Sequence, residues 1–99
     1  MKLNWTTTAL EDLADIWEFL EEQDSAFTAD AIVNRLQRVA QELLELPEIG
    51  RRREDLMPGV RSLKSGSYLL FYVIGRGTIE VIHVLHEHRD LSAIFNPNP

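Results

Sequence analysis

The residues best suited to chemistry are three histidines near the C-terminal end of the chain, His83, His86 and His88, with Arg89 and Asp90 directly behind them. Side chains two positions apart on a strand point the same way, so His86 and His88 could share a metal ion if their strand continues. No third ligand is convincingly placed, and the chain has no cysteine. We therefore expect His83 to be structural, and we expect neither a metal site nor a cofactor.

The exit of the last predicted strand is instead a candidate binding surface. His86, His88, Arg89 and Asp90 lie where side chains are least suited to a core, and we interpret them as contacts to a partner macromolecule. The alternative is an ordinary polar strand end, in which Arg89 and Asp90 form local ion pairs worth about 0–1 kcal/mol when exposed. The sequence leaves both interpretations open.

Four earlier residues present a similar choice. Arg61 and Lys64 flank a strand near a turn, where they could bind acidic side chains or a phosphate, or protect an edge strand from aggregation. Tyr68 and Tyr72 share one strand face, where they could stack on bases or pack with their hydroxyl groups at the rim of the core. No nucleophile–base pair is legible, so we expect a protein that acts by binding and not as an enzyme.

These residues are carried by three predicted strands, residues 60–64, 68–74 and 78–86, which glycine turns separate. Strict alternation divides the last strand into two faces, formed by Ile79, Val81, His83 and Leu85 and by Glu80, Ile82, Val84 and His86. Helices would cover one face of the resulting sheet. The other face is still substantially apolar, and we expect it to stay open as a partner site.

The N-terminal part predicts a strand and a first helix. Residues 2–5 alternate between polar and apolar, as a short strand does. Thr8 and Glu11 have the spacing of a capping box, which predicts that the helix begins at Ala9. Its apolar face is formed at helical spacing by Leu10, Leu13, Ile16, Trp17 and Leu20.

A second helix is predicted over residues 26–46, with Ser25 as its N-cap and Pro47 beyond its end. The short break between the helices implies an antiparallel hairpin. Residues 51–57 are predicted to be a charged connection, and the proline-broken residues 96–99 a frayed tail. The order β-α-α-β-β-β predicts an α+β domain, in which an N-terminal strand and a helical hairpin pack on a C-terminal antiparallel sheet.

The length of 99 residues predicts a single domain, spanning residues 1–99. The net charge of −6 argues against strong sequence-independent binding to nucleic acid. Seven acids without a base lie between positions 11 and 24, which we interpret as a solvated helix face. The absence of cysteine, of a signal-peptide pattern and of a long apolar run predicts a cytoplasmic protein with no membrane partner.

The layout and several motifs resemble the ParE/RelE superfamily of bacterial toxins, and the ParE branch most closely. In chain order the motifs are A-L-E-D-L-A-D-I-W-E-F-L, P-E-I-G-R, P-G-V-R-S-L, G-S-Y-L-L-F-Y and I-E-V-I-H-V-L-H-E-H-R-D. Each motif is weak alone, but their order and spacing together are specific and cover almost the whole chain.

The resemblance implies a toxin of a type II toxin–antitoxin module for plasmid stabilisation. Its partner would be a ParD-like ribbon-helix-helix antitoxin whose acids meet Arg61, Lys64 or Arg89. ParE-like toxins inhibit DNA gyrase by stabilising its cleaved-DNA complex, which makes gyrase the expected target. Operator DNA would be bound only through the antitoxin complex.

Two alternatives remain at this point, a RelE-like ribosome-dependent mRNA endoribonuclease and a non-toxic antitoxin-binding protein. RNA cleavage needs proton transfer and stabilisation of a negative phosphate. The RelE-like basic residues are replaced by Leu69 and Glu87, and the late tyrosine falls near Ala93. A leucine cannot polarise a phosphate and a glutamate repels one, so the resemblance favours the gyrase inhibitor.

Overall fold

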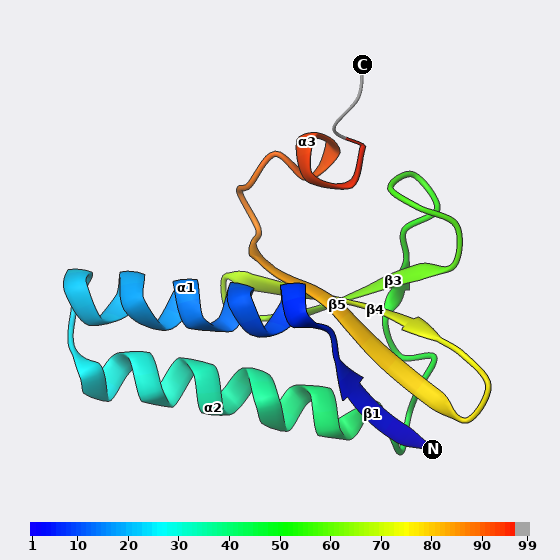
Figure 1. The fold of residues 1–99 in the computed structure, drawn as a ribbon, viewed down its shortest axis with the longest axis horizontal. Helices are drawn as coiled ribbons and strands as arrows, with labels where there is room; N and C mark the ends of the chain where they lie inside the picture. Colours follow the sequence, from blue (N-terminus) through cyan, green and yellow to red (C-terminus); the bar gives the residue numbers. More distant parts are fainter. Residues whose placement is uncertain (97–99) are drawn as a thin grey trace.

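The computed structural model describes residues 1–96 of the 99-residue chain, so the last three residues of the predicted tail lie outside it. Its elements are, in chain order, β1 (Lys2–Trp5), α1 (Thr7–Gln23), α2 (Ala26–Glu42), β2 (Arg51–Arg52), β3 (Val60–Ser65), β4 (Tyr68–Ile74), β5 (Thr78–His86) and α3 (Leu91–Phe95) (Figure 1). The strands form one sheet in the order β1-β5-β4-β3-β2, with β1 parallel to β5 and all other pairs antiparallel. This confirms the predicted α+β architecture.

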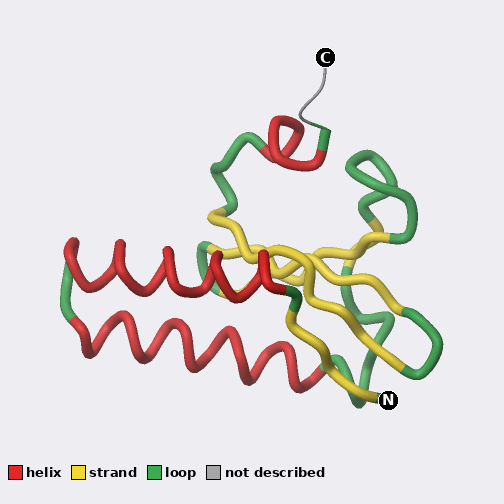
Figure 2. The backbone as a smooth tube through the Cα atoms, in the orientation of Figure 1, coloured by secondary structure: helices red, strands yellow, loops and turns green. Residues whose placement is uncertain are grey.

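The two long helices lie side by side as an antiparallel hairpin on one face of the sheet, while α3 lies over the other face (Figure 2). The helix-covered face holds the larger core. Its fully buried members include Leu36 and Leu43 from the hairpin side and Leu70, Ile79 and Val81 from the sheet. No helix within residues 1–96 is both long and apolar enough to cross a membrane.

The helix boundaries differ from the predicted ones by a few residues. Thr6, and not Thr8, is the N-cap of α1, because its hydroxyl accepts a hydrogen bond from the Ala9 amide at 3.1 Å. Ser25 caps α2 as predicted and accepts from the Thr28 amide at 3.1 Å. The predicted end of α2 at residue 46 is wrong, since the helix stops at Glu42 and tightens into a turn.

The predicted division of β5 into two faces is wrong beyond Val81. Phe71 of β4 pairs with His83, while the next residue, Tyr72, pairs with Val81. The extra residue between them is a β-bulge, which reverses the alternation that a sequence pattern assumes. Val84 and His86 therefore lie on the helix-covered side, and His83 turns to the opposite side together with Leu85.

The second face of the sheet is covered at its centre, so the prediction of an open face is wrong there. Val60 and Phe71 are 0% exposed and Leu85 is 5% exposed. The cover consists of Leu56 from the segment before β3 and of Leu91, Ile94 and Phe95 from α3. The sequence prediction had no helix at α3. It also treated β2 as part of a connection, although its two arginines pair with β3.

Candidate functional site

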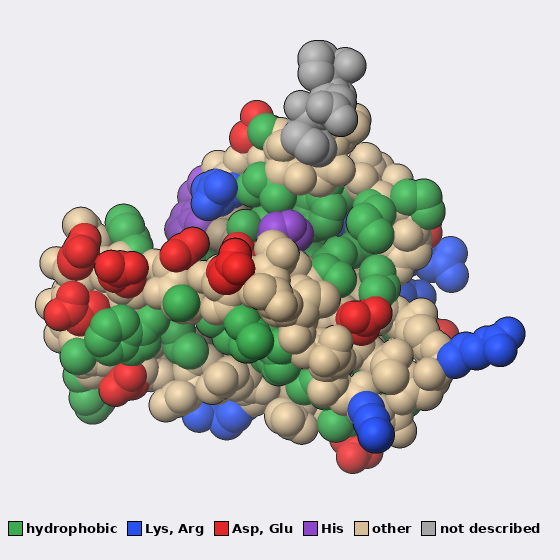
Figure 3. All heavy atoms as spheres, viewed as in Figure 1, with side chains coloured by type: hydrophobic (Ala, Val, Ile, Leu, Met, Phe, Trp, Pro, Cys, Tyr) green, Lys and Arg blue, Asp and Glu red, His purple; other side chains and the backbone are tan. Residues whose placement is uncertain are grey.

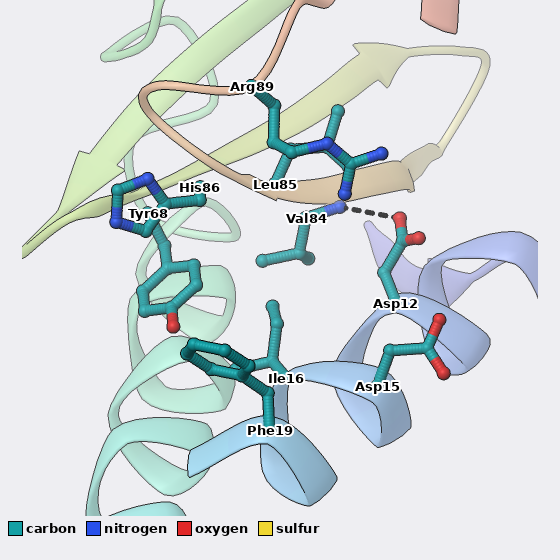
Figure 4. A pocket seen from close by; sticks show the side chains of 9 residues that line it. All are labelled: Asp12, Asp15, Ile16, Phe19, Tyr68, Val84, Leu85, His86 and Arg89. Atoms are coloured by element: carbon teal, nitrogen blue, oxygen red, sulfur yellow. Dashed lines mark hydrogen bonds between the residues drawn. The ribbon is translucent and has the colours of Figure 1, made fainter. Parts of the chain in front are cut away.

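A groove of about 350 Å³ lies between α1 and the end of β5. Figure 4 shows the side chains of its lining, which are Asp12, Asp15, Ile16, Phe19, Tyr68, Val84, Leu85, His86 and Arg89. Three of the predicted site residues, Tyr68, His86 and Arg89, thus meet in one place. They come from two strands and the turn behind them, which the hairpin register brings together.

The floor of the groove is apolar. Ile16 and Val84 are buried beneath it, whereas Phe19 stands at its edge with 57% of its surface exposed. The ring of Tyr68 meets the ring of His86 edge to face, with centroids 5.4 Å apart. A tyrosine hydroxyl is neutral over the physiological pH range, and burial raises the pKa of Tyr68 further from that range. The floor can therefore accept an apolar side chain without removing a charge from water.

Asp12 fixes one wall of the groove, although the sequence analysis gave it no role. Strand β1 ends at Trp5 and Thr6 makes the last contacts to β5, at the carbonyl oxygens of Val81 and Ile82, so this segment offers no partner to the Val84 amide. The Oδ2 atom of Asp12 takes that place by accepting a hydrogen bond from the Val84 amide at 2.9 Å. The same oxygen lies 2.8 Å from Nδ1 of His83. Asp12 thereby links α1 to β5 beside the groove.

The end of β5 and the turn behind it contribute His86 and Arg89 to the lining, and His88 lies beside His86. His86 Nδ1 accepts a hydrogen bond from the His88 amide at 3.2 Å, and the two rings lie 5.3 Å apart. Arg89 is exposed. The ion pairs within residues 1–96 are Arg53–Asp55, Lys64–Glu87 and His83–Asp12, so Arg89 has no anionic partner there. Figure 3 shows acidic side chains along the α1 side and histidine and basic side chains near the end of β5.

The other predicted site residues lie elsewhere. Tyr72 is 0% exposed and belongs to the core, which corrects its assignment to a binding surface. Arg61 donates hydrogen bonds to the carbonyl oxygens of Glu48 and Gly50 at 3.1 and 2.9 Å, so its guanidinium group holds a loop. Asp90 caps α3 by accepting from the Ala93 amide at 3.3 Å. Arg89 and Asp90 do not form the local ion pair that the sequence allowed within residues 1–96.

Lys64 lies near the groove but faces the other side of the sheet. It is paired in register with Leu69, a member of the second-face cluster, and its ammonium group is 3.5 Å from Glu87. This pair at the surface, with Lys64 exposed and Glu87 partly buried, contributes little to stability, but it compensates the charge of Lys64. Arg89 is consequently the cation of the groove lining, and it makes no ion pair within residues 1–96.

The lining of the groove has properties that suit the binding of a polypeptide. Within residues 1–96, no three His, Cys, Asp or Glu side chains are grouped so that they could hold a metal ion. Every buried side-chain nitrogen or oxygen in that range has a hydrogen-bond partner. An apolar floor between an acidic wall and a basic wall suits a polypeptide segment with an apolar anchor and flanking charges.

Comparison with known proteins gives matches in sequence and in structure. A family model described as "ParE toxin of type II toxin-antitoxin system, parDE" matches residues 3–91. Toxin ParE1 of Mycobacterium tuberculosis is 36% identical over 80 residues, which are 80% of this chain and 82% of that one. Toxin ParE1 of Caulobacter vibrioides is 34% identical over 85 residues, 86% of this chain and 88% of that one.

A solved structure has the same fold. It is described as "Chromosomal ParDE TA system from P. aeruginosa", and it superimposes with a TM-score of 0.78 over 87% of this chain and 95% of that chain. The two sequences are 22% identical, so this match shows a shared fold and no more.

Proposed function

This chain belongs to the ParE toxin family of type II toxin–antitoxin systems, and from that premise we propose that its groove is the surface on which a ParD-like antitoxin neutralises it. We further propose that the free toxin inhibits DNA gyrase by stabilising the cleaved-DNA complex. The observation that carries the first proposal is the exposed Arg89 beside an apolar floor, with no carboxylate paired to it in the described residues.

The antitoxin segment that suits this groove has an apolar side chain followed by a carboxylate. The apolar side chain would cover Phe19 and Tyr68, and the carboxylate would pair with Arg89. Arg61 is not expected to take part, because its guanidinium group is already bonded to two carbonyl oxygens. Operator DNA would be bound by the antitoxin of the complex, since the toxin itself carries a net charge of −6.

Arg89→Glu tests the antitoxin proposal, with Arg76→Glu as its matched control. Both arginines are exposed, but Arg76 lies in the turn between β4 and β5, away from the groove. We expect Arg89→Glu to weaken binding of the cognate antitoxin by about tenfold or more in calorimetric titration, because a charge pair becomes a repulsion. Equal affinities of the two variants would contradict the proposal.

The gyrase proposal is tested with purified toxin, gyrase and supercoiled plasmid. We expect linear plasmid to accumulate when the reaction is quenched with detergent and protease, and prior addition of antitoxin to prevent this. No effect on supercoiling or cleavage at micromolar toxin would contradict gyrase as the target.

The two alternatives have their own outcomes in parallel assays. Ribosome-dependent cuts in messenger RNA, detected by primer extension, would assign the chain to the RelE-like activity. The site offers little for that chemistry, because Leu69 packs in an apolar cluster and Glu87 lies beside Lys64. Unimpaired growth during expression of stable toxin alone would identify a non-toxic antitoxin-binding protein.

A further inference from the structure

A second apolar surface lies at the opposite end of β4 from the groove. Eight large hydrophobic side chains are exposed in the described part of the chain, and four of them surround one hollow of about 520 Å³. These four are Met1, Leu46, Ile49 and Ile74. Single exposed apolar residues are ordinary, but their convergence from three separate segments on one hollow is typical of an interaction site.

The segment that forms this hollow is held in place from beneath. The Tyr72 hydroxyl donates to the Pro47 carbonyl oxygen at 2.7 Å and accepts from the Gly50 amide at 2.9 Å. Arg61 binds two more carbonyl oxygens of the same segment. Because these polar groups are satisfied from inside, Leu46 and Ile49 are presented outward on a fixed backbone. A partner would lose little conformational freedom of this loop on binding.

The charge around the hollow restricts what can occupy it. Glu45 and Glu48 are the ionisable side chains of its lining, and the N-terminal ammonium group belongs to Met1 of the same lining. A second copy related by a two-fold axis would place these carboxylates against their own copies, in a chain whose net charge is −6. The same charges repel nucleic acid. An occupant with Lys or Arg beside its apolar side chains is complementary to the hollow.

We propose that this hollow is a second protein-docking surface, which takes a basic amphipathic polypeptide segment with an apolar side chain between Leu46, Ile49 and Ile74 and its cations beside Glu45 and Glu48. The proposal goes beyond the antitoxin and gyrase proposals and does not depend on them. The two surfaces share no lining residue and lie at opposite ends of β4, with Tyr68 in the groove and Ile74 in the hollow. An antitoxin segment in the groove would therefore leave the hollow free for a different segment.

The test uses the full chain labelled with ¹⁵N and two synthetic helical peptides of equal length and equal leucine spacing. One peptide carries Lys at all its polar positions and the other carries Glu. We expect the Lys peptide to shift the amide signals of Leu46, Ile49 and Ile74, and the Glu peptide to leave them unchanged. Ile49→Ser should weaken binding of the Lys peptide about tenfold, because a central apolar contact of the hollow is lost.

Phe27→Ser is the matched control, because Phe27 is 84% exposed but lies outside the hollow. The double variant Glu45→Lys/Glu48→Lys keeps the apolar surface and should exchange the preference between the two peptides. Melting curves would show that each variant is folded.

Three results would overturn the proposal. One is that the Lys peptide shifts mainly the amide signals of the acidic face of α1. Another is equal binding of both peptides, or of the wild type and Ile49→Ser. The third is a dimer in analytical ultracentrifugation that Ile49→Ser dissociates, which would make the occupant a second copy of this chain.

Discussion

Strand β4 has a tyrosine near each end, and the two tyrosines differ in their hydrogen bonding. At one end the Tyr72 hydroxyl makes two hydrogen bonds to the segment after α2, and Arg61 makes two more. At the other end Tyr68 has no hydrogen bond among the described residues, and Arg89 has no ion pair among them. Polar groups whose bonds are satisfied inside the molecule stabilise it, whereas those left over remain available to a partner.

The strongest way to test this contrast is to remove each tyrosine. Tyr72→Ala should lower the free energy of unfolding by about 3–5 kcal/mol, because a fully buried aromatic ring leaves a cavity. Tyr72→Phe isolates the hydroxyl group and should cost about 1–3 kcal/mol, since the Pro47 carbonyl and the Gly50 amide lose their partner. Urea unfolding monitored by tryptophan fluorescence provides the measurement.

Tyr68→Phe is the control for the tyrosine pair. With no hydrogen bond to lose, it should change the free energy of unfolding by less than about 0.5 kcal/mol. Equal losses from Tyr72→Phe and Tyr68→Phe would contradict the contrast between the two ends of β4.

The next effect in size concerns the wall of the groove. Asp12→Ala removes the acceptor of the Val84 amide and should cost about 1.5–3 kcal/mol, as the loss of a hydrogen bond to a charged group does. It should also weaken antitoxin binding, because α1 is no longer held against β5. Asp15→Ala, an exposed change in the same lining, should leave stability within about 0.5 kcal/mol of wild type. Indistinguishable unfolding curves for the two alanine variants would refute this role of Asp12.

The smallest effect appears only in alkaline solution. Burial raises the pKa of both Tyr68 and Tyr72 in the folded state. A raised folded-state pKa favours the protonated phenol, so its contribution is complete below the unfolded-state tyrosine pKa of about 10 and is lost as pH rises through the folded-state value. Stability should therefore fall above about pH 10. The double variant Tyr68→Phe/Tyr72→Phe should show a shallower fall, and an unchanged slope would contradict this cause.

The sequence predicted the helical hairpin and the three long strands because their apolar periods are regular over many residues. It placed Val84 and Leu85 on the wrong faces because a bulge in β5 adds one residue, which no period reveals. Strand β2 and helix α3 were missed because two and five residues are too few for a period. Both elements exist through packing on the rest of the sheet.

The candidate site was predicted in part. His86 and Arg89 were predicted from their position at the exit of a strand and Tyr68 from the strand face that it shares with Tyr72, and the hairpin register brings these three together. Tyr72 was indistinguishable from Tyr68 by residue type and spacing, because the depth of the core at each end of β4 is a tertiary property. Asp12 was read as one member of a solvated acidic face, since its bond to Val84 spans 72 positions of sequence.

Hydrogen exchange of the toxin with and without its cognate antitoxin tests the central claim, that the groove end of β4 is the antitoxin surface, most directly. We expect the antitoxin to slow exchange in the C-terminal turn around His88 and Arg89 and at the α1 side of the groove, and to leave the amides of Leu46 and Ile49 unchanged. Protection centred on the segment after α2, with exchange at His88 and Arg89 unchanged, would contradict the claim that the antitoxin binds at the groove end of β4.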